Sequence, residues 1–82
     1  MNNQDRFDAA IEAGLYIRAV RLALRFAAGK GSRSGCWSWA DQAVVAGKLA
    51  GIELLTGGKS WPDLAGMTRQ LNAKFGTEAG NE

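Results

Sequence analysis

Residues 5–28 read DRFDAAIEAGLYIRAVRLALRFAA, and this stretch decides the fold of the chain. It contains no proline and a single glycine, and it is rich in alanine, leucine and arginine, which are strong helix formers. The sequence therefore predicts one long helix over about residues 5–28.

The apolar residues of this predicted helix fall on two stripes. One stripe consists of Phe7, Ile11, Leu15, Leu22 and Phe26, and the other consists of Ala13, Ile17, Val20 and Leu24. A surface helix of a soluble protein has one such stripe, which faces the core. We therefore expect the helix to lie between two packing partners, either two other helices or one helix and a second subunit.

A second helix is predicted over about residues 38–56. It should begin at Ser38, because the serine hydroxyl can accept a hydrogen bond from the amide of Asp41 in a capping arrangement. Gly57 and Gly58 are expected to end it, since glycine readily takes the left-handed conformation that closes a helix.

A third helix is predicted over about residues 61–75. Ser60 is expected to cap its start, and Pro62 falls in the first turn, where its missing N–H breaks no helical hydrogen bond. Gly76 should end the helix.

These elements predict an all-α fold, a small three-helix domain over residues 1–76 with a flexible tail over residues 77–82. A chain of 82 residues has no room for a second domain. The N-terminus carries acids where a signal peptide needs a basic start, and no uncharged apolar run approaches ~18 residues. We therefore expect a cytoplasmic protein, and the lone Cys36 fits a reducing compartment.

The composition argues against an enzyme. Histidine is absent and cysteine occurs once, which excludes intrachain disulfides, clustered Cys/His metal sites and histidine-based triads. Asp8 and Glu12 share a helix face, but without a second carboxylate pair they are typical of a solvated helix start. We expect no catalytic residues, no metal and no cofactor.

A basic segment without any acid spans residues 18–33 and overlaps the flexible connection predicted for residues 29–35. The candidate partner-binding residues are Arg18, Arg21, Arg25, Lys30, Arg33 and Trp37. Three interpretations stay open: a solvated face, a surface that binds an acidic protein through its arginines, and a surface that binds nucleic acid phosphates while bases stack on indoles.

Ala43, Gly47 and Gly51 recur every four residues in the second predicted helix and would let another helix approach closely. Glycine costs about 1 kcal/mol relative to alanine inside a helix, so a packing role is expected. The face is filled either by the long first helix or by a second subunit. A homodimer would also cover the two apolar stripes of the first helix if that helix lay at an edge.

We expect a small non-enzymatic interaction protein that binds a larger macromolecule, most readily a protein with an acidic surface. Small helical chains without cofactors are typical of accessory proteins, including inhibitors carried by phages and mobile elements, and this analogy is one of size and type. The alternative is a small basic nucleic-acid-binding module or regulator that uses residues 18–33. No membrane partner is expected.

Overall fold

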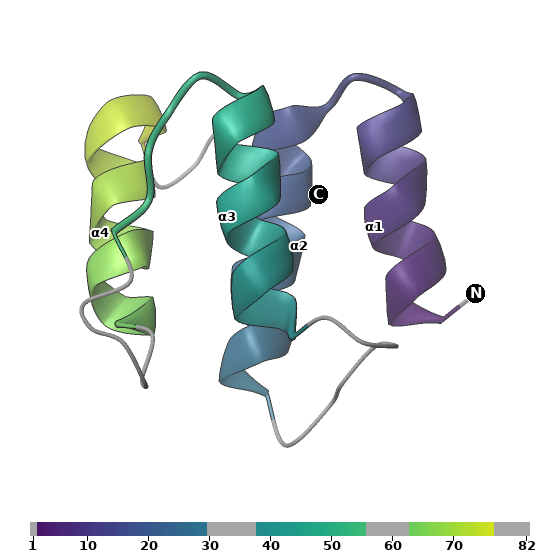
Figure 1. Ribbon diagram of the computed structural model, residues 1–82, viewed down its shortest axis with the longest axis horizontal. Coiled ribbons are helices and arrows are strands. Elements are labelled where there is room, and N and C mark those ends of the chain that lie inside the picture. The colour runs from purple at the N-terminus through teal and green to yellow at the C-terminus, as the bar shows by residue number, and fades with distance from the viewer. Residues whose placement is uncertain (1, 30–37, 56–62, 77–82) are drawn as a thin grey trace.

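The computed structural model describes residues 2–29, 38–55 and 63–76. Within these ranges the chain forms helices and no strand (Figure 1), so the all-α prediction is confirmed. The helices are α1 (Asn3–Glu12), α2 (Tyr16–Ala28), α3 (Trp39–Leu49) and α4 (Leu64–Phe75). The described residues therefore contain four helices where three were predicted.

The single long helix predicted over residues 5–28 is wrong, because the chain reverses between α1 and α2. Gly14 has a φ of 76°, in the left-handed region that favours glycine. The amides of Gly14 and Leu15 donate to the carbonyls of Ile11 and Ala10, at 3.0 and 2.9 Å. These two bonds form a Schellman motif, which ends a helix and turns the chain away from its axis.

The same motif ends α3, so the prediction that this helix continues to about residue 56 is also wrong. Gly51 has a φ of 83°. Its amide donates to the carbonyl of Lys48 at 3.1 Å, and the amide of Ile52 donates to the carbonyl of Gly47 at 2.9 Å. The residues that follow, up to residue 55, are not helical.

Side-chain caps fix three of the helix starts, and at α1 the Asn2 side chain accepts from the amide of Asp5 at 2.8 Å. The predicted cap of α3 is confirmed, since the Ser38 hydroxyl accepts from the amide of Asp41 at 3.1 Å. The predicted start of the last helix at about residue 61 is wrong, because α4 begins after Asp63. The Asp63 carboxylate accepts from the amide of Gly66 at 2.9 Å and satisfies one of the unpaired amides of the first turn.

Several predictions fall on residues outside the described ranges. They are the stop at Gly57 and Gly58, the cap at Ser60, the connection after Gly29 and the tail over residues 77–82. At the end of α4, Gly76 takes a φ of 82° and follows the last helical residue as predicted.

Helix α2 lies at the centre of the fold and packs against α1, α3 and α4. It runs antiparallel to these three helices (Figure 1). Its buried side chains are Ala19, Val20, Leu22, Ala23, Leu24 and Phe26. The expectation that this part of the chain lies between packing partners is therefore confirmed for α2.

Trp39 joins three helices in the core. It is the first residue of α3 and is only 2% exposed. Its ring meets Phe7 of α1 edge-on, with centroids 5.8 Å apart, and Phe26 of α2, with centroids 4.9 Å apart. Edge-to-face contacts of this kind add to the stabilisation from burial. This aromatic cluster fixes how α1 and α3 lie against α2.

Candidate functional site

A groove runs between α1 and α3, which lie side by side and run in the same direction (Figure 1). Its volume is about 300 Å³, and its walls consist of Phe7, Asp8 and Ile11 from α1 and Gln42, Val45 and Leu49 from α3. Residues three and four apart share one face of a helix, so each wall is a single helix face. We call this feature the α1–α3 groove.

The wall of the groove on α3 exposes apolar side chains. Val45 is 50% exposed and Leu49 is 49% exposed. Among the described residues, the only other large apolar side chains exposed to this degree are Leu15 and Leu55. Contiguous exposed apolar surface marks sites of interaction in soluble proteins. The α1–α3 groove is therefore the best candidate for a functional surface.

One end of the groove is closed by a polar contact. The side-chain amide of Gln4 donates to the Gln42 side chain at 3.0 Å and to the Asp8 carboxylate at 2.8 Å. The bond to Gln42 joins α1 to α3 near their N-termini, and the bond to Asp8 lies within α1. A carboxylate has about four acceptor positions, so Asp8 can also accept from a cation placed in the groove.

The edge of the groove on α1 is acidic. Asp5, Asp8 and Glu12 are exposed and follow one another at spacings of three and four residues, on one side of the helix. The guanidinium of Arg6 lies 5.6 Å from the centre of the Phe26 ring, on the side of α1 that meets α2. Arg6, the cation of α1, is therefore directed toward α2, whereas the three acids lie on the side of α1 next to the groove.

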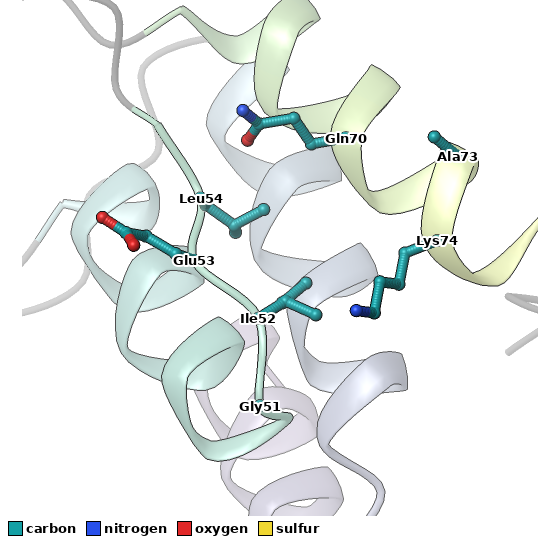
Figure 2. A pocket seen from close by; sticks show the side chains of 7 residues that line it. All are labelled: Gly51, Ile52, Glu53, Leu54, Gln70, Ala73 and Lys74. Carbon is teal, nitrogen blue, oxygen red and sulfur yellow. The ribbon is translucent and has the colours of Figure 1, made fainter.

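A second hollow, of about 460 Å³, lies between α4 and the non-helical segment after α3 (Figure 2). Leu54 of this segment is 4% exposed and points toward the helices, while Glu53 points away from α4. The Gln70 side chain accepts from the amide of Leu55 at 3.0 Å. Lys74 is the one charged side chain directed toward the hollow in this view. These contacts make the region a junction between the segment and α4.

The structure separates the predicted basic residues from one another. Arg18 and Arg25 are exposed on α2, whereas Arg21 is half-buried. The Arg21 guanidinium donates to the Asn72 side chain at 2.9 Å and to the carbonyl of Gly76. A cation at the C-terminus of a helix also complements its dipole. Arg21 therefore joins α2 to the end of α4, and the remaining candidates, Lys30, Arg33 and Trp37, lie outside the described residues.

We expect Arg21→Gln to lower the free energy of unfolding by roughly 1 to 2 kcal/mol, because the Asn72 side chain and the end of α4 lose their donors. The loss in stability stays moderate because the buried Arg21 Nε has no acceptor among the described residues, so its removal costs no hydrogen bond there. Urea unfolding followed by circular dichroism measures the change. Arg18→Gln is the matched control on the same helix and should change stability by less than about 0.5 kcal/mol. Equal, small changes in the two variants would contradict a structural role for Arg21.

The small residues of α3 are used inside the chain. Ala43 and Gly47 are buried, and a Cβ atom at Gly47 would lie 3.1 Å from two side-chain atoms of Leu54. The residue that fills the space at Gly47 therefore comes from the segment after α3 and not from the first helix. Gly51 lies beyond the end of α3 and is exposed, so the three small residues do not share one helix face.

Sequence reasoning missed the α1–α3 groove. A continuous helix over residues 5–28 could not have placed α1 beside α3, so the groove depends on the break at Gly14. A signal was present in the spacing of Val45 and Leu49, which are one helical turn apart and on a different side of α3 from Gly47. Apolar residues on two sides of a short helix indicate a second contact surface.

Comparisons of the chain with protein-family models, curated proteins and solved structures find no match. Among the described residues, no helix is long and apolar enough to cross a membrane. No group of three or more acidic, cysteine or histidine side chains in the same part of the chain is placed to hold a metal ion.

Proposed function

We propose that this is a small non-enzymatic interaction protein that binds a larger protein partner through the α1–α3 groove. The observation that carries the proposal is the exposure of Val45 and Leu49 in a groove whose other apolar wall, Phe7 and Ile11, is packed against the core. Covering such side chains gains about 25 cal/mol for each Å² of apolar surface removed from water.

The composition of the groove supports a protein as its occupant. Protein interfaces combine a few apolar anchors with a polar rim that excludes water. In the groove, Phe7 and Ile11 form the deeper apolar wall, and Asp8 and Gln42 supply polar groups. A protein that acts by occupying a site on a larger one suits an accessory or inhibitory role, and we place this role in the cytoplasm.

A second candidate function is nucleic-acid binding through the basic segment. Arg18 and Arg25 are exposed on α2 and lie seven residues apart, which places them on the same side of the helix about two turns from each other. Two cations at this spacing can contact phosphates. Arg21 contributes less to such a surface, because its guanidinium is bonded to α4.

Affinity capture with matched variants tests the proposal. We expect the wild type and Leu55→Lys to capture the same protein partner from the native host, and Leu49→Lys to capture at least ~10-fold less, which corresponds to about 1.4 kcal/mol. Leu55 is the control because it is 58% exposed and does not line the groove. Nuclease treatment should leave the captured protein unchanged.

Two outcomes would oppose the proposed function. If nuclease removes every partner, the nucleic-acid alternative is supported. If Leu49→Lys and Leu55→Lys capture the same partner equally well, the α1–α3 groove is not the docking surface. Both leucines are exposed, so the variants should keep the wild-type melting temperature, and circular dichroism checks that they do.

A further inference from the structure

We infer that the segment bound in the α1–α3 groove is a basic amphipathic helix of a different protein. The inference rests on the proposed function and names the kind of partner that the groove fits. It draws on the spacing of the apolar side chains, on the charge along the edge of the groove, and on the surfaces that a second copy of this chain could offer.

The spacing of the walls favours a helix as occupant. Phe7 and Ile11 are four residues apart on α1, and Val45 and Leu49 are four residues apart on α3, so each wall places an apolar side chain about every 6 Å. A partner helix with apolar residues one turn apart repeats at the same distance. An extended segment would need backbone partners, and the walls are helices whose own backbone groups are already paired.

The charge along the groove favours a basic partner. Asp5, Asp8 and Glu12 are exposed along α1. On α3, the exposed Asp41 and Lys48 carry opposite charges and leave that helix balanced. Lysine or arginine residues that flank an apolar stripe would therefore meet carboxylates on the α1 side. Complementary charge of this kind favours the correct partner and speeds association.

A second copy of the chain fits the groove poorly. If two α1–α3 grooves paired with α1 opposite α1, the acidic edges would meet, and like charges at an interface are unfavourable. If they paired with α1 opposite α3, the acids would face a helix whose exposed charges, Asp41 and Lys48, are balanced. The exposed described cations outside α1 and α3 are Arg18, Arg25, Arg69 and Lys74. These four lie on α2 and α4, which carry no large exposed apolar side chain within the described residues. Elsewhere on the described surface, Lys48 lies beside Leu49 and Arg18 lies one turn after Leu15. Each is a single cation beside exposed apolar side chains, and neither forms the row of cations along an apolar stripe that would pair with the acidic edge of α1.

Fluorescence anisotropy with a labelled synthetic helix tests the inference. The probe is a peptide of about 14 residues, ~21 Å of helix, with leucine on one face and lysine elsewhere. A second peptide carries glutamate in place of each lysine. We expect the lysine peptide to bind the wild type at least ~10-fold more tightly than the glutamate peptide, with an affinity that falls as salt rises.

Variants of the protein show where the peptide binds and separate the apolar contribution to its affinity from the electrostatic contribution. Leu49→Lys should weaken binding of the lysine peptide by ~10-fold or more, and Leu55→Lys should leave it within about twofold. Asp8→Asn combined with Glu12→Gln should weaken it by about three- to tenfold. Glu53→Gln removes an exposed acid that is not on the α1–α3 groove, so it is the charge control and should have no such effect.

The remaining outcomes overturn the inference in distinguishable ways. If both peptides bind equally and Leu49→Lys weakens both, the groove binds apolar helices without a charge preference, so the proposed function stands and the inference falls. If Leu49→Lys leaves the binding of both peptides unchanged, the proposed function and the inference are both wrong. Light scattering tests whether a second copy of the chain occupies the α1–α3 groove. A dimer that Leu49→Lys dissociates would show that it does.

Discussion

Trp39→Ala is expected to unfold most of the chain at room temperature. The indole is 2% exposed and holds Phe7 and Phe26 in edge-to-face contact, so its removal leaves a cavity where α1, α2 and α3 meet. Truncating a buried tryptophan costs about 3–5 kcal/mol. The core of a domain near this size supplies only about 3–5 kcal/mol of stability, so the loss is comparable to the whole. Far-ultraviolet circular dichroism measures the lost helix.

Trp39→Phe is the matched control for this prediction. The indole Nε1 is buried and has no hydrogen-bond partner in the part of the chain that the structure describes, so phenylalanine removes no bond there and keeps a ring beside Phe7 and Phe26. We expect it to cost about 1–2 kcal/mol and to leave the chain folded. If the alanine variant melts within a few degrees of the wild type, Trp39 does not have the central role assigned to it.

Gly47→Leu has the second largest expected effect, a loss of roughly 2–3 kcal/mol. A Cβ atom at this position would already lie 3.1 Å from the Cγ and Cδ1 atoms of Leu54, and a leucine side chain would have to displace Leu54 from the core. The displaced segment also carries the Leu55 amide that donates to Gln70, so the attachment of α4 should weaken as well. Urea unfolding measures the change.

Two further variants separate crowding at Gly47 from helix propensity. Gly47→Ala adds one carbon, and its better helix propensity of about 1 kcal/mol offsets the tight contact, so little net change is expected. Val45→Leu adds a similar apolar group to an exposed position of the same helix and should change stability by less than about 0.5 kcal/mol. A stable Gly47→Leu variant would show that Leu54 moves without cost.

The parts of the fold that the sequence could predict are those decided by neighbours along the chain. The cap at Ser38 and the stop at Gly76 depend on residues within one turn, and both are present in the structure. The break at Gly14 is also local, but a single glycine costs only about 1 kcal/mol in a continuous helix. Composition alone therefore predicted one unbroken helix over residues 5–28. Both breaks have an Ala-Gly pair followed by an apolar residue, at 13–15 and at 50–52, but the same pattern at 65–67 lies inside α4, so the pattern alone does not mark a helix end.

The parts that could not be predicted depend on contacts between distant residues. Arg21 was assigned to a basic surface because its sequence neighbours are exposed cations, while its partner Asn72 lies 51 positions away. The α1–α3 groove likewise exists because α1 and α3 both pack on α2. No local sequence pattern predicts this packing. Local sequence therefore predicted the helical class, the start of α3 and the end of α4, and long-range packing determined which surfaces remain open.

The central position of α2 has a consequence for the order in which the parts of the fold come together. Helices α1, α2 and α3 follow one another along the chain, and α2 packs on both of its sequence neighbours, so these contacts close only short loops. Helix α3 lies between α2 and α4 in the sequence. The Arg21 contacts that hold α4 against α2 therefore join residues 51 and 55 positions apart. Contacts between distant residues form late, because closing a long loop costs more entropy than closing a short one. The side chains that line the α1–α3 groove come from α1 and α3, so the formation of the groove does not require α4 to dock.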